Sequence, residues 1–256
     1  MWGLLMGSLY LTKYSTPEIR GDNHIHVRKF GSNISVGTTE GVISTDGGTY
    51  PGFLTAADTV RVASGGDSAD TLAGASARKV VVSGLDANWR LASEEIELAG
   101  ASASASTTTE FIRINRAYVS EVGTYGGTCA GDINIETAGG ISLAVIPATI
   151  SQTEMCIYTI PAGYVGFVTR ITASSETNKP VNIFGHARLD ADNTVAELRA
   201  DRTVFKRLAI TAEFSQEFTT PDRLLEKTDI WVTGEKTSAG TSIVYAELDI
   251  NLVRIE

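Results

Sequence analysis

Short segments in which apolar and polar residues alternate run along most of the chain, with turn residues between them. The last segment, residues 243–255, shows the alternation most clearly. One face carries Val244, Ala246, Leu248, Ile250 and Leu252, and the other carries Glu247, Asp249 and Asn251. A period of two residues is that of a β-strand with one buried side. Many short strands separated by turns predict an all-β fold.

A first β unit is predicted at residues 36–127. It contains a β-branched run (79–83), a turn-like sequence (84–88) and renewed alternation (89–98), which together indicate a β-hairpin. Residues 111–119 predict a further strand, and the glycine-rich turn after it ends the unit.

A second unit is predicted at residues 128–256, as a jelly-roll-like β-sandwich. Eight strand-like segments support it, at residues 132–136, 141–146, 155–160, 164–173, 181–189, 204–218, 228–232 and 243–255. Eight strands are the number of a jelly roll.

Three segments depart from the alternation. Residues 193–208 and 221–227 have spacings compatible with short helices, but both are flanked by β pattern, so neither is assigned as a helix. Residues 100–109 are rich in Gly, Ala, Ser and Thr, and we expect them to form a long exposed loop.

The N-terminal residues 1–35 are predicted to form an extended arm. The stretch is apolar at its start but lacks the basic region of a secretory signal, so a signal peptide is not expected. Apolar side chains on an arm gain free energy by packing on a neighbouring subunit. The predicted interface anchors are Trp2, Leu4, Leu5 and Met6.

Composition excludes several classes of protein. Lys and Arg number 21 against 30 Asp and Glu, a net charge of −9, which is the wrong sign for binding nucleic acid or anionic lipid. No apolar run approaches the roughly 20 residues of a membrane span. Cys129 and Cys156 fit neither a disulfide scaffold nor a zinc site, and we expect buried free thiols.

The candidate metal sites are weak. His24 and His26 would share one face of a strand, but no third ligand is evident, and His186 lies far along the chain. Asp190 and Asp192 resemble the start of a calcium loop. However, the residues that follow do not fit the EF-hand pattern, so an Asp-rich turn is favoured and calcium stays open.

The candidate catalytic groups are equally sparse. Glu94 with Glu95, and Glu213 with Glu217, could be offered as glycosidase pairs, but solvated strand faces explain them. Trp231 lies between two aliphatic residues and is predicted in the core or an interface. The sequence therefore predicts no catalytic, cofactor-binding or metal residues, and no enzyme.

Four phrases of the sequence resemble recurring segments of virion structural proteins of tailed bacteriophages, particularly marine and cyanobacterial ones. They are RKVVVSGLDANW (78–89), FIRINRAYV (111–119), GGTCAGDI (126–133) and YTIPAGY (158–164). The C-terminal part is similar, in pattern only, to jelly-roll units of phage decoration and fibre proteins.

The resemblance implies a viral structural protein with no active site to transfer. We expect a decoration or cement protein on the capsid surface, a homotrimer whose partner is the major capsid protein, binding neither nucleic acid nor membrane. A neck, tail or fibre component is the alternative within this class. A carbohydrate-binding β-sandwich is the alternative of another class, and it would need exposed aromatic residues in a groove.

Overall fold

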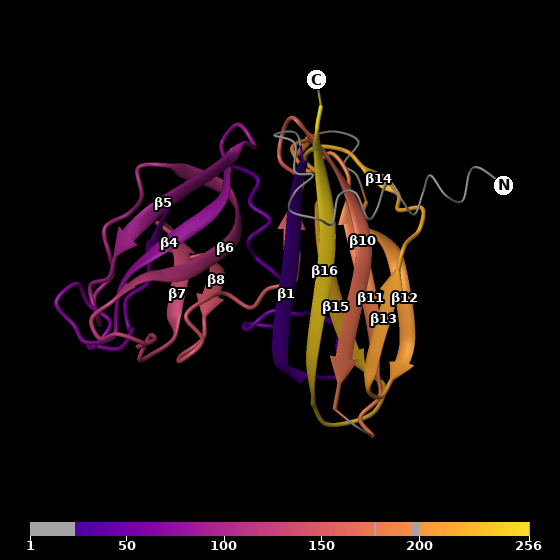
Figure 1. Cartoon of the computed structure of the whole chain (residues 1–256), viewed down its shortest axis with the longest axis horizontal. Coiled ribbons are helices and arrows are strands. Elements are labelled where there is room, and N and C mark those ends of the chain that lie inside the picture. Colours follow the sequence, from indigo (N-terminus) through magenta and orange to yellow (C-terminus); the bar gives the residue numbers. More distant parts are fainter. Residues whose placement is uncertain (1–23, 177, 196–199, 256) are drawn as a thin grey trace. The chain divides into compact units, whose positions relative to one another are not determined.

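A computed structural model describes residues 24–176, 178–195 and 200–255, and these residues form sixteen β-strands (Figure 1). The all-β prediction is confirmed, because no helix occurs within the described ranges. In particular, these ranges hold no helix long and apolar enough to cross a membrane.

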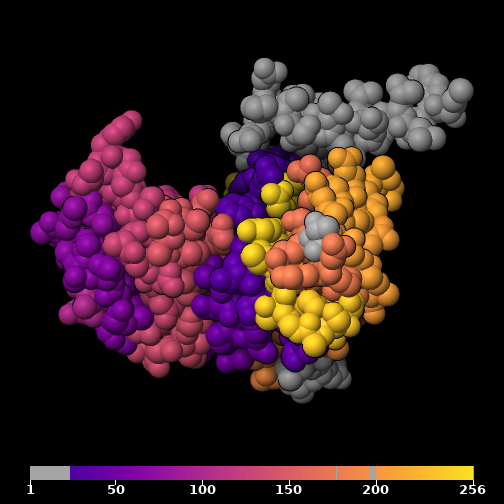
Figure 2. Space-filling view, turned by 90° about the horizontal axis from the view of Figure 1, so that it is seen from below, coloured from indigo at the N-terminus to yellow at the C-terminus, as the bar shows by residue number. Residues whose placement is uncertain are grey.

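The chain divides into two compact units, and one is inserted into the other. Unit 2 is Ser44–Met155, and unit 1 combines Met1–Ile43 with Cys156–Glu256. Figure 2 shows the indigo residues that begin the described chain next to the yellow residues near its C-terminus. The limits of the two units differ from the boundaries expected at 35/36 and 127/128. The reason is that β1 (His24–Val36) pairs antiparallel with β16 (Ser242–Arg254), the last strand of the chain, so the end of the expected arm belongs to the C-terminal sheet.

Unit 1 is a sandwich of two five-stranded antiparallel sheets. The first sheet has the order β1, β16, β10 (Tyr164–Ser175) and β13 (Glu213–Glu217), with β14 (Arg223–Leu224) also pairing with β10. The second has the order β12 (Arg202–Ile210), β11 (Val181–Arg188), β15 (Asp229–Lys236) and β2 (Gly41–Val42), with β9 (Ile157–Thr159) also pairing with β15. In Figure 1 the long strands β1, β16 and β10 lie side by side.

Aliphatic side chains from both sheets form the core of unit 1. The predicted apolar face of β16 is buried throughout, and its residues Leu248 and Ile250 pack in one cluster with Ile171, Ile183 and Val232. The predicted alternation of the last strand is therefore confirmed. The opposite face of β16 carries the polar side chains of Glu247, Asp249 and Asn251.

The chain leaves and re-enters unit 1 at neighbouring positions. The backbone N–H of Ile43 donates to the carbonyl of Val232 (2.9 Å), and the N–H of Cys156 donates to the carbonyl of Ile43 (2.9 Å). Gly31 of β1 lies directly over this crossing, and a Cβ atom there would collide with the Ile43 oxygen and the Cys156 nitrogen. Only glycine allows this close approach of backbones.

The substitution Gly31→Ala is therefore expected to lower the free energy of unfolding by about 1–3 kcal/mol, the usual cost of overpacking. Urea denaturation of purified protein measures it. Gly37→Ala is the matched control, because a Cβ at Gly37 meets no atom within 4 Å. Equal stabilities of the two variants would contradict the close approach at Gly31.

Unit 2 is a six-stranded antiparallel sheet. Its order is β5 (Leu91–Glu97), β4 (Ala77–Asp86), β6 (Glu110–Val122), β3 (Asp58–Val62), β7 (Ile133–Thr137) and β8 (Ser142–Ile146). Residues 151–153, which follow β8, return to β6, where the N–H of Val119 donates to Ser151 O and that of Thr153 to Ala117 O, both at 2.9 Å.

The low-complexity segment 100–109 is a loop, as its composition indicated, and half of its residues are exposed, but two of its side chains anchor it to β3. Ser104 and Thr107 are buried, and their hydroxyl oxygens accept hydrogen bonds from the backbone N–H groups of Val62 and Val60 in β3. The N–H groups of the same two residues donate back to β3. Small hydroxyl side chains here replace backbone partners, which a reading by composition does not detect.

Candidate functional site

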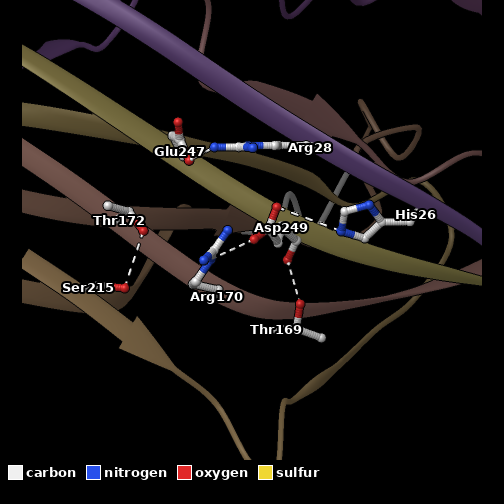
Figure 3. Close-up of polar contacts among 8 residues, drawn as sticks. All are labelled: His26, Arg28, Thr169, Arg170, Thr172, Ser215, Glu247 and Asp249. Atoms are coloured by element: carbon white, nitrogen blue, oxygen red, sulfur yellow. Dashed lines mark hydrogen bonds and ion pairs between the residues drawn. The ribbon is translucent and has the colours of Figure 1, made fainter. Parts of the chain in front are cut away.

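The outer face of the first sheet of unit 1 carries a row of alternating charge across four strands. The strand registers place Arg28 of β1 opposite Asp249 of β16, Asp249 opposite Arg170 of β10, and Arg170 opposite Glu217 of β13. Opposite charges on adjacent strands attract each other. Figure 3 shows how Arg28, Asp249 and Arg170 project from one face of the sheet.

Asp249 is the centre of this row. The residue is 8% exposed, and the Nε of Arg170 donates to its Oδ2 at 2.7 Å. The second carboxylate oxygen, Oδ1, is buried, makes no hydrogen bond within the described part of the chain, and lies 3.7 Å from Nε2 of His26. The hydroxyl of Thr169, at a bulge in β10, donates to the backbone carbonyl of Asp249 (3.2 Å; Figure 3). Arg170 is thus held in place by a largely desolvated carboxylate.

A second ion pair lies beside the first. Nη2 of Arg28 donates to Oε2 of Glu247 at 2.7 Å. The hydrogen bond and the charge of Glu247 raise the pKa of Arg28, although the guanidinium is more than half exposed. Glu247 also lies opposite Thr172 of β10, which in turn lies opposite Ser215 of β13.

These side chains surround a hollow of about 380 Å³ on the sheet face. Six of its lining residues carry its chemistry: Arg28, Arg170, Thr172, Ser215, Tyr245 and Glu247. Tyr245 is 51% exposed, whereas its neighbours Val244 and Ala246, on the opposite face of the strand, are buried. The hollow therefore combines guanidinium donors, carboxylate acceptors, hydroxyl groups and one accessible aromatic ring.

The candidate histidines do not form a recognisable metal centre. His24 and His26 are two residues apart in β1, so both side chains lie on the polar face of the sheet, as their spacing predicted. Nε2 of His186 lies 2.9 Å from Oε1 of Glu40 and 2.8 Å from the hydroxyl oxygen of Thr233. Over the ranges that the structure describes, no three His, Cys, Asp or Glu residues are placed to hold a metal ion.

The Asp-rich segment after β11 forms a turn. The N–H of Asn193 donates to the carbonyl of Asp190 (2.9 Å), and Nζ of Lys227 donates to Oδ2 of Asp192 (2.7 Å). The carboxylate of Asp192 is thus already paired with an ammonium group.

Two carboxylate pairs were weighed as glycosidase candidates. Glu94 and Glu95 have partners within the fold, whereas Glu213 and Glu217 are exposed on β13. Glu94 accepts the N–H groups of Thr108 and Thr109 at 2.8 Å, which lowers its pKa although burial opposes the shift. Glu95 lies 3.3 Å from the ammonium of Lys79. Glu213 lies on β13 and lines the hollow.

The remaining candidates are buried. Trp231 is 7% exposed and stacks on His186 with ring centroids 5.1 Å apart. Cys129 and Cys156 are buried free thiols. Burial raises the pKa of Cys156 to about 12, so this thiol is not a nucleophile at neutral pH.

The four predicted arm anchors, Trp2, Leu4, Leu5 and Met6, lie outside the described residues. The hollow was not anticipated from the sequence. The alternation of Arg170, Thr172 and Ser174 in β10 contained part of the signal, but the hollow also requires knowing that β10 lies between β16 and β13.

No family model matches the sequence, and no curated protein matches it. Among solved structures, T=1 particles derived from infectious bursal virus are 13% identical, with 91% of this chain and 70% of that chain covered and a TM-score of 0.24. A mutant VP2 protein of infectious bursal disease virus is also 13% identical, with 98% and 74% covered and a TM-score of 0.22. These weak neighbours are viral capsid proteins, and TM-scores this low mean that little of the overall arrangement is shared.

Proposed function

We propose that the protein is a non-enzymatic structural protein of a tailed-phage virion that decorates the capsid shell. The observation that carries the proposal is the set of phrases at 78–89, 111–119, 126–133 and 158–164 that resemble phage virion proteins. The first lies in β4 and the turn that follows it, and the second lies in β6, the strand that pairs with β4 in unit 2.

Unit 2 also presents apolar side chains to solvent. Leu72, Leu91 and Ile141 are between 43% and 50% exposed, and Tyr125, in the glycine-rich turn after β6, is fully exposed. Side chains of this kind supply contact area when subunits assemble. Because these apolar side chains are distributed over unit 2, they suit several small contacts with other subunits better than one large interface.

The partner in this proposal is the major capsid protein, and the oligomer is a trimer at a lattice three-fold axis. A symmetric trimer engages several shell subunits at once, so that weak contacts add to a strong attachment. The net charge of −9 keeps the protein soluble at high copy number and away from the packaged genome. A neck, tail or fibre position remains the second candidate in this class.

The N-terminal arm provides the test of attachment. Deleting residues 1–14 removes Trp2, Leu4, Leu5 and Met6 but leaves β1 intact. The truncated protein is expected to keep the melting temperature of the full chain and to lose binding to undecorated particles in a co-sedimentation assay. Full occupancy by the truncated protein would show that the arm is not the anchor.

A further inference from the structure

We propose that the hollow on the outer face of the β1–β16–β10–β13 sheet is a binding site for a neutral saccharide. This inference does not depend on a position in the virion. Its volume of about 380 Å³ lies within the range of about 300–1,000 Å³ typical of small-molecule sites. The hollow is polar, in contrast to the apolar core on the other side of the same sheet.

The donors and acceptors of the hollow are held in position before a ligand arrives. Arg170 is fixed by Asp249 and Arg28 by Glu247, each through a 2.7 Å hydrogen bond (Figure 3). A guanidinium has five N–H donors, and the bond from Arg170 Nε leaves its Nη groups for a ligand. Paired guanidinium and carboxylate groups side by side match the alternating donors and acceptors of adjacent sugar hydroxyls.

Tyr245 supplies the apolar contact that a sugar ring requires. Its neighbours in the same strand alternate between the core and the hollow, so the ring stands on the hollow side and is half exposed. A flat aromatic ring packs against the C–H face of a pyranose while the hydroxyls at its edge bind polar groups. Thr172 and Ser215, whose hydroxyl oxygens are 3.4 Å apart, provide further hydrogen-bonding groups.

The charges select against acidic sugars. Two positive side chains, Arg28 and Arg170, and two negative ones, Glu213 and Glu247, line the hollow. Asp249, which forms an ion pair with Arg170, adds a third negative charge. A sialylated or sulfated glycan would bring its own anion into a surrounding that is already negative overall. The ligand class is therefore an uncharged saccharide.

The test is binding of the full chain to an array that displays neutral and sialylated oligosaccharides, followed by calorimetric titration of the best neutral ligand. Tyr245→Ala is expected to weaken that affinity by about tenfold or more, a loss near 1.4 kcal/mol. Thr172→Val removes one hydroxyl at constant shape and is expected to weaken it by a smaller factor. Tyr125→Ala, a fully exposed tyrosine of unit 2, is the matched control and is expected to bind as the parent protein does.

Each other outcome overturns the inference. Failure to bind any neutral saccharide on the array removes the site, and binding confined to sialylated saccharides contradicts the charge argument. Neutral-saccharide binding that survives Tyr245→Ala, or that Tyr125→Ala weakens equally, places the site elsewhere. Thermal melting of each variant shows that the compared proteins are folded.

Discussion

Asp70→Asn is expected to lower the free energy of unfolding of unit 2 by about 2–4 kcal/mol, since hydrogen bonds to a buried charged group are strong and their donors would be left unsatisfied. Asp70 is 4% exposed and joins three chain segments. Its Oδ1 accepts the N–H groups of Ala77 and Ala130, and its Oδ2 accepts those of Ala130 and Gly131, at 2.9–3.1 Å.

The amide of an asparagine cannot replace this carboxylate. Either orientation turns its NH₂ group towards at least one backbone donor, which then has no acceptor. Urea denaturation measures the loss, and hydrogen exchange of peptides from residues 44–155 locates it. Asp67→Asn is the control, because Asp67 is exposed and its carboxylate accepts the N–H of Ala69. A stability change no larger than that of the control would contradict the role assigned to Asp70.

Arg170→Met is expected to destabilise unit 1 by about 2–3 kcal/mol. Breaking a buried pair costs about 3–5 kcal/mol, because it leaves a desolvated charge without its partner. The expected loss is smaller than this range because the Arg170 side chain is 37% exposed, so that water screens part of its interaction with Asp249. With Arg170 removed, Asp249 loses the hydrogen bond to Oδ2, and its Oδ1 makes none in the part of the chain described.

Two comparisons separate this effect from loss of surface charge. Arg28→Met removes a guanidinium from the same face, but its pair with Glu247 is exposed, so a change within about 0.5 kcal/mol is expected. Adding Asp249→Asn to Arg170→Met should cost less than Asp249→Asn alone, as a double-mutant cycle of urea denaturation measures. Strict additivity would show that the two residues do not interact.

Features decided by neighbouring residues could be predicted from the sequence. The alternation in residues 243–255 predicted both the strand β16 and its buried face, because the direction of each side chain follows from the strand geometry alone. The hairpin of β4 and β5 was also predicted, although its turn was placed too early. Gly84 lies within β4, and the turn closes where the N–H of Asp86 donates to the carbonyl of Arg90 (2.9 Å).

One predicted strand, residues 204–218, is two strands. β12 and β13 belong to different sheets, and the chain passes between them at residues 211 and 212. Ala209, just before this passage, has a φ of 52°. Alanine is not a residue whose presence signals that conformation, so the sequence offered no turn signal there.

Features that depend on distant residues could not be predicted. Arg28 and Glu247 are 219 positions apart, and their strands become neighbours only in the folded sandwich. The same pairing moves residues 24–36 into unit 1, which is why the expected unit boundaries differ from those of the structure. The hollow depends on three such pairings at once, since β1, β16, β10 and β13 must all be adjacent.

The proposed function assigns the protein to a phage virion. Its most direct test is the copy number of the protein in such purified particles, measured by quantitative mass spectrometry against the major capsid protein. A decoration protein is expected at hundreds of copies per particle, in a simple ratio to the shell subunits. About five to twenty copies would contradict decoration and indicate a neck, tail or fibre ring. Absence from the particles would contradict the virion role altogether.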